Sequence, residues 1–174
     1  MGIDLKNWMQ NLPDGSDLLA LNLCGTHDCV TQHIRLPHFF CCQDLTVYEQ
    51  LLLGVRALDI RVRADGKCLT MVHGIFPAYN HSCHRANLMD MGDVLSQCYR
   101  FLDECPGEAV VFQFKNDNGK ENEQCFDNLF YTYIKGKEPY WYLEDRVPTL
   151  GAARGKLVLI CLLYTSPSPR DRSL

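Results

Sequence analysis

The architecture of this chain follows from its stretch Val55-Arg-Ala-Leu-Asp-Ile-Arg-Val62. Apolar and charged residues alternate there, so Asp59 and Arg61 share one face of an extended chain while Leu58 and Ile60 share the other. The alternation predicts a β-strand over 55–62. One face of this strand belongs to a core, and the other carries a carboxylate and a guanidinium.

Further elements are expected on both sides of this strand. The predicted strands are Leu18–Cys24, Cys68–Val72, Ala109–Phe114 and Leu157–Ile160, and the predicted helices are Asp4–Leu12, Thr46–Leu53, Asp90–Glu104 and Glu121–Ile134. Strands that alternate with helices favour an α/β fold with a parallel sheet, either doubly wound and open or closed as a (β/α)8 barrel. No G-x-G-x-x-G follows the first strand, so the dinucleotide-binding fingerprint is missing.

Composition limits the class of protein. The 174 residues are 47% hydrophobic and 22% charged, with a formal net charge of −4, which indicates one globular domain and gives no reason to expect a nucleic-acid partner. The longest apolar run, Leu157–Tyr164, is far shorter than the ~20 residues of a membrane-spanning helix. Residues 1–10 contain no secretory signal, so we expect a cytoplasmic protein.

The chain has ten cysteines and no C-x-x-C pair. We expect them to be reduced and to fill apolar positions. The cysteines in apolar surroundings are Cys24, Cys68, Cys98, Cys125 and Cys161. Disulfides, or a zinc site at His81, Cys83 and His84, are the alternatives, although the spacing of those three residues is poor for zinc.

The last residues differ from the rest. Residues 161–174 are polar, rich in proline and without periodicity, and they resemble translated cloning or adaptor sequence more than a native disordered tail. The domain is therefore expected to occupy residues 1–160. We expect the native protein to continue beyond Ile160, with this chain as a fragment.

Polar residues follow or end four of the predicted strands. They are His27 and Asp28, Asp59 and Arg61, His73 with Gly74, and Lys115. Each has an ordinary explanation alone, as a hydrogen-bonding histidine, an ion pair or a solvated lysine. Together they are expected at one end of a parallel sheet, where ligands bind in α/β folds.

These side chains favour phosphate chemistry. A planar guanidinium matches phosphate oxygens, and two imidazoles can divide the roles of acid and base near neutral pH. The set is suited to cleavage of a phosphodiester by an internal hydroxyl, without a metal.

Five segments carry a resemblance. In chain order they are Cys24-Gly-Thr-His-Asp28, Gln43-Asp-Leu-Thr-Val-Tyr-Glu-Gln50, Gly54-Val-Arg-Ala-Leu-Asp-Ile-Arg61, Val72-His-Gly74 and Val110-Val-Phe-Gln-Phe-Lys115. From about Trp8 to Ile160, the chain resembles the X domain of phosphatidylinositol-specific phospholipase C, most of all the bacterial-type and X-domain-only proteins. The resemblance implies a TIM-like (β/α)8 barrel, here incomplete with about five strands, and cleavage of phosphatidylinositol to diacylglycerol and a cyclic inositol phosphate.

The resemblance also implies residue roles. His27 corresponds to the general base and His73 to the general acid, with Asp28 assisting His73. Arg61 corresponds to the cation on the phosphate and Asp59 to a supporting acid. The inositol contact corresponds to Lys115, and Gly74 is a further substrate-binding position.

The resemblance implies no cofactor and no metal, because Arg61 stands where calcium-dependent relatives have an acidic ligand. The implied partners are phosphatidylinositol, or a related phosphodiester lipid, and a membrane surface contacted peripherally. Cys24 replaces a proline common in relatives. The later strands of the family supply a carboxylate that orients the base and an aromatic contact, which no residue here matches, so we expect this chain by itself to be unstable or inactive.

Two other functions remain open: a metal-dependent glycerophosphodiester phosphodiesterase, and a non-catalytic or degenerate phosphoinositide-binding module. The first usually has Glu-x-Asp where this chain has Asp59-x-Arg61. The residues Ile75, Phe76, Pro77 and Tyr79 form either an apolar rim at the mouth of the site or ordinary loop packing.

Overall fold

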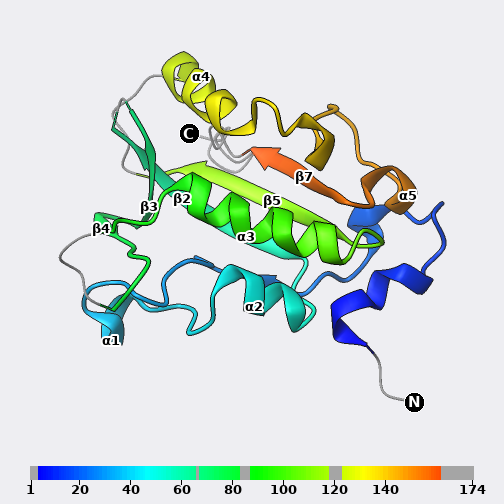
Figure 1. The fold of residues 1–174 in the computed structure, drawn as a ribbon, viewed down its shortest axis with the longest axis horizontal. Coiled ribbons are helices and arrows are strands. Elements are labelled where there is room, and N and C mark those ends of the chain that lie inside the picture. The colour runs from blue at the N-terminus through cyan, green and yellow to red at the C-terminus, as the bar shows by residue number, and fades with distance from the viewer. Residues whose placement is uncertain (1–3, 66, 83–86, 118–122, 162–174) are drawn as a thin grey trace, which may run out of the picture.

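A computed structural model describes residues 4–65, 67–82, 87–117 and 123–161. One seven-stranded sheet runs through it in the order β4-β3-β2-β5-β7-β6, and β1 pairs with the start of β2 (Figure 1). The strands are β1 (Gly25–Thr26), β2 (Ala57–Ala64), β3 (Leu69–His73), β4 (Phe76–Pro77), β5 (Ala109–Asn116), β6 (Trp141–Tyr142) and β7 (Lys156–Cys161). Strands β1, β2, β5, β6 and β7 are parallel, whereas β3 and β4 are antiparallel additions to β2. Among the described residues the sheet is open.

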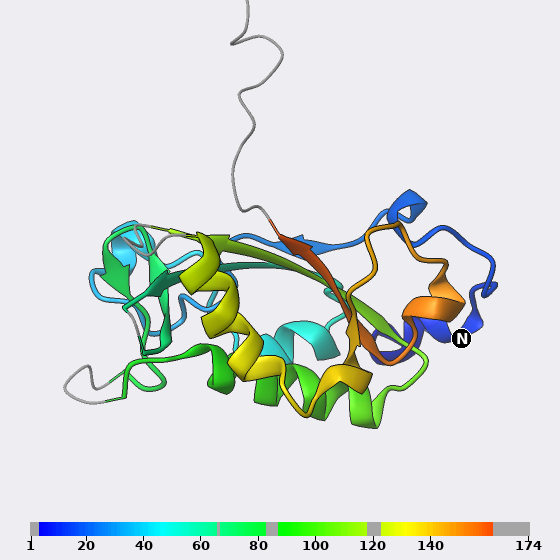
Figure 2. The same ribbon diagram turned by 90° about the horizontal axis from the view of Figure 1, so that it is seen from above.

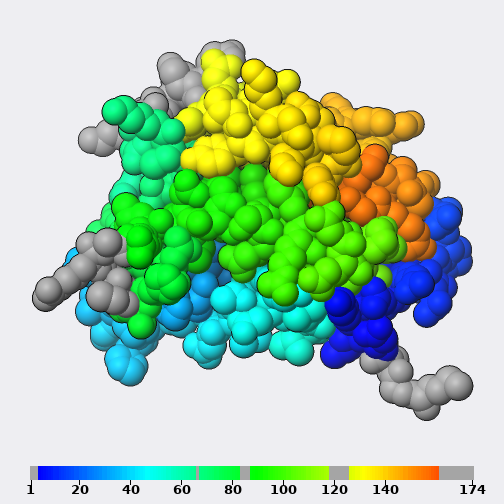
Figure 3. All heavy atoms as spheres, in the orientation of Figure 1, coloured from blue at the N-terminus to red at the C-terminus, as the bar shows by residue number. Residues whose placement is uncertain are grey.

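The longer helices cover one face of this sheet. The α-helices are α1 (Pro37–Phe40), α2 (Val47–Leu52), α3 (Met91–Glu104), α4 (Glu123–Ile134) and α5 (Leu150–Ala153), and the 3₁₀ helices are Leu5–Asn11, Leu18–Ala20 and Glu138–Tyr140. Figure 2 shows α2, α3 and α4 together on one side of the sheet. In the space-filling view, α3 and α4 form a continuous surface over that face (Figure 3).

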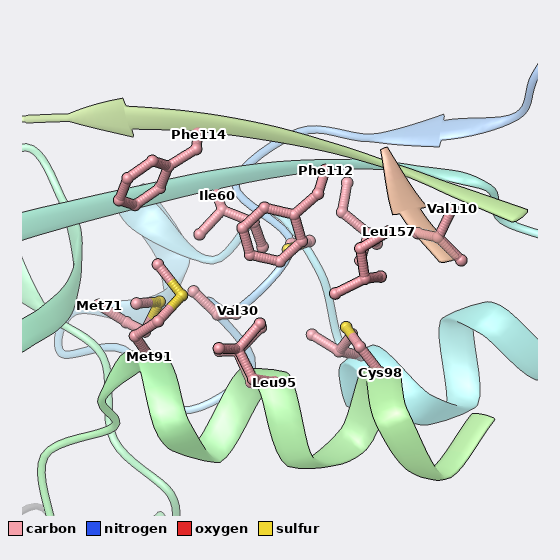
Figure 4. Packing of buried hydrophobic residues seen from close by; sticks show 14 of the residues in the cluster. Val30, Ile60, Met71, Met91, Leu95, Cys98, Val110, Phe112, Phe114 and Leu157 are labelled. Atoms are coloured by element: carbon pink, nitrogen blue, oxygen red, sulfur yellow. The ribbon is translucent and has the colours of Figure 1, made fainter. Parts of the chain in front are cut away.

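The main core lies between the sheet and α3 (Figure 4). Along β2 the buried residues alternate with partly exposed ones, so Leu58 and Ile60 enter the core and Asp59 and Arg61 face the other side. Helix α3 presents one apolar stripe because its buried residues recur at helical spacing. They are Met91, Val94, Leu95, Cys98, Phe101 and Leu102.

The other face of the sheet has a smaller core at one end only. The N-terminal segment and α5 meet the beginnings of β5 and β7 there, and Met9, Leu18, Val111 and Leu150 are buried between them. Toward the carboxyl ends of the parallel strands, this face carries Asp59, Arg61, Gln113 and Lys115. The face that would line a closed barrel is therefore apolar at the beginnings of the parallel strands, which we call the floor. It is polar at their carboxyl ends, which we call the mouth.

A buried ion pair joins the N-terminal segment to this floor. The Arg56 guanidinium lies 2.8 Å from the Glu108 carboxylate, and both side chains are fully buried. Arg56 also donates hydrogen bonds to the carbonyls of Leu51 and Lys6, and Glu108 accepts one from the Met9 amide. Burial lowers the pKa of Arg56, and the hydrogen bond and charge of Glu108 oppose that shift. The pair satisfies groups from three segments that are far apart in sequence.

Several predicted elements are confirmed with small shifts at their ends. Thr46 caps α2 in a capping box with Glu49, and Gly54 follows that helix with φ +96°. The predicted strand 55–62 begins at Ala57, and the N-terminal helix is of the 3₁₀ type. The start of the predicted helix at Glu121 lies outside the described residues.

The predicted strand Leu18–Cys24 is wrong. Asp17 caps a short 3₁₀ turn by accepting a hydrogen bond from the Leu19 amide, and regular pairing begins only at Gly25. The placement of 68–72 in a parallel sheet is also wrong, because the short connection from Ala64 to Leu69 returns β3 antiparallel to β2. Two short strands, β4 and β6, were not predicted.

The cysteine prediction is confirmed only in part. All seven described cysteine side chains are free, and Cys29, Cys98 and Cys105 are buried. Cys24 is exposed, contrary to its expected apolar setting, because it lies just before β1 rather than inside a buried strand. Cys83, His84 and the tail 162–174 lie outside the described residues, so the zinc alternative and the domain boundary stay predictions.

Candidate active site

The turn after β1 places His27 and Asp28 at the polar mouth. Gly25 allows the close approach of β1 to β2, since a Cβ at that position would lie 3.3 Å from the Ala57 Cβ. Asp28 then takes a left-handed conformation with φ +44°, which aspartate tolerates better than most residues. Its side chain is 1% exposed and lies between the two histidines and Arg61.

His27 is oriented by two carboxylates. Its Nδ1 lies 2.8 Å from Asp59 Oδ2, and its Nε2 lies 3.2 Å from Asp28 Oδ2. An ionised carboxylate only accepts hydrogen bonds, so Asp59 favours the proton on Nδ1 and leaves the Nε2 lone pair for chemistry. The Gln43 side chain also donates a hydrogen bond of 3.1 Å to the backbone carbonyl of His27.

His73 reaches the same carboxyl from the other side. Its Nε2 lies 3.6 Å from Asp28 Oδ2, and its Nδ1 lies 3.0 Å from the carbonyl oxygen of Phe40. The ring centroids of His27 and His73 are 6.3 Å apart. His73 arrives on antiparallel β3, whose register (Val62 opposite Met71) brings the end of β3 back toward the middle of β2. The predicted meeting of the histidines is therefore confirmed, but the strand direction that produces it was not predicted.

Arg61 bridges both acidic partners of the histidines. Its Nε lies 3.2 Å from Asp28 Oδ1, and its Nη2 lies 3.2 Å from Asp59 Oδ2. A third carboxylate, Asp117, lies 3.9 Å from its Nη1. The guanidinium remains partly exposed, so it is both fixed in position and open to a ligand.

Asp28 has the most unusual environment of these groups. Burial raises its pKa, while the nearby positive charges of Arg61, His73 and His27 act in the opposite direction. Neither of its carboxyl oxygens has a hydrogen-bond partner within the described part of the chain, although three basic groups lie within ion-pair distance. Its buried carboxyl is therefore held by charge rather than by hydrogen bonds.

Lys115 and Gly74 lie at the edge of this group. Lys115 pairs across the sheet with Arg61, and its Nζ lies 3.9 Å from Asp117 Oδ1. The amide of Gly74 donates a 3.2 Å hydrogen bond to Asp117 Oδ2. All seven predicted site residues therefore belong to one region of the molecule.

The sequence reasoning missed Asp117, and it missed Phe40 at the end of α1 together with Cys42 in the loop that follows. Asp117 follows Lys115 by two positions, so the period of a strand could have found it. Phe40 and Cys42 left no such signal, because they approach His73 through a loop whose path sequence does not encode simply. Thr31 fixes this loop by accepting a 2.8 Å hydrogen bond from the Cys42 amide.

Two cavities bear on the location of the site. One of about 220 Å³ lies beside His27 and Asp59 on the inner face of the sheet. The other, of about 560 Å³, lies between α3 and α4, and its lining residues include none of the site residues. The first is lined by two of the predicted site residues, His27 and Asp59, so it is the better candidate for a substrate site.

Comparison with known proteins gives a consistent group of relatives, although no family model matches. The chain is 27% identical over 174 residues to the 1-phosphatidylinositol phosphodiesterase of Listeria monocytogenes, covering 94% of this chain and 50% of that protein. It is 28% identical over 163 residues to the 1-phosphatidylinositol phosphodiesterase of Staphylococcus aureus, covering 88% of this chain and 50% of that protein. The chain thus spans about half the length of the curated relatives that it matches.

Comparison with solved structures gives the same group of relatives. A mutant of the phosphatidylinositol-specific phospholipase C from Staphylococcus aureus matches with a TM-score of 0.78 and 27% identity, over 92% of this chain and 53% of that one. The enzyme of the same name from Listeria monocytogenes matches with a TM-score of 0.76 and 27% identity, over 94% and 58%. With its open sheet, the chain has the fold of part of a TIM-like α/β barrel, as the resemblance implied.

Proposed function

We propose that this chain carries the part of a phosphatidylinositol-specific phospholipase C active site that contains the two catalytic histidines. The observation that carries the proposal is the placement of two imidazoles, 6.3 Å apart, on either side of Asp28 and next to Arg61. The homologues named phosphodiesterases support this reading. The substrate is phosphatidylinositol or a related phosphodiester lipid.

In the proposed reaction, His27 Nε2 takes the proton of the inositol 2-hydroxyl as that oxygen forms a bond to phosphorus. The bond from phosphorus to the diacylglycerol oxygen breaks, and protonated His73 donates its proton to that oxygen from Nε2. The products are diacylglycerol and a cyclic inositol phosphate, which a water molecule can open by the same two steps in reverse roles. Each proton transfer contributes about 10²–10⁴-fold to the rate.

The charged residues have separate tasks in this scheme. Arg61 offers a guanidinium to the phosphate oxygens as their negative charge grows. Asp59 holds the tautomer of His27, and Asp28 supplies negative charge beside the His73 ring that must carry a proton. We assign the inositol ring to the edge of the site that is formed by Lys115, Gly74 and Asp117.

The test is an assay of the longest expressed protein that contains these residues, with phosphatidylinositol vesicles and with a soluble inositol phosphodiester. We expect both substrates to be cleaved, and cleavage to persist in excess chelator because Arg61 supplies the cationic charge. Loss of activity in chelator would instead favour a metal-dependent glycerophosphodiester phosphodiesterase. Lipid binding without turnover, unchanged in His27→Ala, would favour a binding module.

We further propose that the protein meets the membrane through an apolar rim, defined as Leu36, Phe39 and Ile75. Their exposed fractions are 56%, 80% and 68%. Phe40 connects the rim to the site, since its ring lies 5.7 Å from that of His73 and 4.3 Å from that of Phe76. Of the four residues considered from sequence, Tyr79 is buried, Phe76 packs against Phe40 and Pro77 is half-buried in β4. Ile75 is the exposed one, and it is the member that we assign to the rim. One solved structure of the similar Staphylococcus aureus enzyme concerns the modulation of its membrane binding. None of the described helices could span a membrane.

Phe39→Asp is expected to weaken vesicle binding by about 10–100-fold, because a fully buried phenylalanine contributes about 1.5–3 kcal/mol. Cleavage of the soluble substrate should stay within about twofold, since the Phe39 side chain is largely exposed and has no part in the proposed reaction. Vesicle sedimentation and soluble-substrate kinetics measure the two effects. Phe76→Asp is the matched comparison and should reduce both, because it disturbs Phe40 beside His73. Equal losses in Phe39→Asp would contradict the rim.

A further inference from the structure

A cysteine that the proposed reaction does not use lies within the catalytic group. One ligand atom from each of His27, Asp28 and Cys42 lies within 4.8 Å of the others. The Cys42 Sγ lies 3.8 Å from the Phe40 carbonyl and 3.9 Å from His73 Nδ1, both long contacts. Imidazole, carboxylate and thiolate are the three side chains that bind zinc in proteins.

Two features make these atoms suitable as ligands of a metal ion. Asp59 holds Nδ1 of His27, which leaves Nε2 as the free nitrogen, and a carboxylate behind a histidine is the usual support of a metal ligand. The Asp28 carboxyl is 1% exposed and points into the cluster without a hydrogen-bond partner among the described residues. Its Oδ2 is already 3.2 Å from His27 Nε2, close to the separation of about 3.5 Å between ligands of tetrahedral zinc.

Hydrogen bonds hold the loop that carries Cys42 close to His27 and Asp28. The buried Thr31 hydroxyl accepts hydrogen bonds from the amides of Cys42 and Gln43, at 2.8 Å and 3.2 Å. The Gln43 side chain then binds the carbonyl of His27. The backbone segments that carry Cys42 and His27 are therefore held close to each other, while their side chains stay free to turn toward an ion.

The local charge permits a cation despite Arg61. Three carboxylates (Asp28, Asp59 and Asp117) surround two cationic side chains, Arg61 and Lys115. The net charge of these five groups is −1, and it becomes −2 when Cys42 binds as a thiolate. Arg61 lies on Oδ1 of Asp28 and His27 on Oδ2, so the guanidinium and the ion would use different oxygens.

We propose that His27, Asp28 and Cys42 form a binding site for Zn²⁺ or a similar thiophilic divalent ion. Binding forms bonds to His27 Nε2, Asp28 Oδ2 and Cys42 Sγ, releases the thiol proton to solvent and leaves the fourth position to water. The binding rests on the geometry alone. Its consequence rests on the proposed function: the ion occupies the lone pair of the general base, so zinc inhibits the enzyme.

Metal titration of the 174-residue chain tests the site. Co²⁺ is used as a spectroscopic substitute, because thiolate ligation produces a sulfur-to-cobalt charge-transfer absorption. We expect this absorption to saturate and to disappear in Cys42→Ala, with Zn²⁺ affinity weakened at least about 100-fold against a competing chelator. Cys41→Ala is the matched control, because its thiol points instead to the Gln43 carbonyl and Asp44. An unchanged absorption or zinc affinity in Cys42→Ala, or an equal loss in Cys41→Ala, would overturn the site.

A second measurement separates this site from the proposed reaction. Zn²⁺ should inhibit cleavage of the soluble phosphodiester reversibly, and Cys42→Ala should stay active but resist inhibition at least about 10-fold better. If zinc binds through Cys42 and cleavage continues at full rate, the zinc site stands and the assignment of His27 as the base fails. If zinc does not bind through Cys42 but His27→Ala abolishes cleavage, the zinc site fails and the proposed function stands.

Discussion

Replacing His27 or His73 with alanine is expected to lower kcat for a soluble inositol phosphodiester by about 10²–10⁴-fold in each case. In the proposed reaction, each variant removes one proton transfer, either from the attacking hydroxyl to His27 or from His73 to the departing oxygen. The loss should appear in kcat more than in KM, because both contacts strengthen in the transition state.

The double variant gives a stricter test. Because both rings serve one displacement at phosphorus, His27→Ala/His73→Ala should lose much less than the product of the two single losses. His38→Ala is the control, since His38 is an exposed histidine in the nearby helix α1. A loss below about tenfold in either single variant would contradict the assigned roles.

The second large effect concerns stability. Arg56→Met is expected to lower the free energy of unfolding by about 3–5 kcal/mol, because it leaves the Glu108 carboxylate buried without its partner. The same change also removes the donors that satisfy the carbonyls of Leu51 and Lys6. Urea denaturation, followed by circular dichroism, measures the change.

Replacing both partners separates the cost of an unpaired charge from the worth of the pair. Arg56→Met/Glu108→Leu should recover part of the lost stability, because neither charge is then buried alone. Recovery will be incomplete, since the Met9 and Gln10 amides lose their acceptor. Arg146→Met, in an exposed pair with Glu144, should leave stability almost unchanged. Equal effects at Arg56 and Arg146 would refute the argument.

Local patterns were enough to predict the longer helices and the central strands, whereas the four-residue helices α1 and α5 were not predicted. The alternation around Asp59 and Arg61 predicted their shared face correctly, and the apolar stripe of α3 predicted that helix nearly to the residue. These features depend on residues that are close in sequence, so the rules of periodicity and capping can predict them.

What escaped prediction depends on contacts between distant segments. The residues of β3 fit either strand direction, and only the short connection to β2 makes it antiparallel. The apolar run after Leu18 has the composition of a strand, but the Asp17 cap and the floor of the sheet bend it into a 3₁₀ turn. Cys42 approaches His73 through a loop fixed by Thr31, a relation that composition does not reveal.

The N-terminal segment makes contacts with residues that are synthesised much later, and this affects the order of folding steps during synthesis. Met9 offers its amide to Glu108, 99 residues later, and its carbonyl to the guanidinium of Arg154, 145 residues later. A ribosome that adds about 5–20 residues per second needs roughly 7–30 s to reach Arg154 after Met9. For that interval the segment lacks its contact with Arg154, although Arg56 and Glu108 are made earlier. Its docking can therefore be completed only after Arg154 is made, while protection of the Met9 amide from deuterium exchange should report the earlier contact with Glu108.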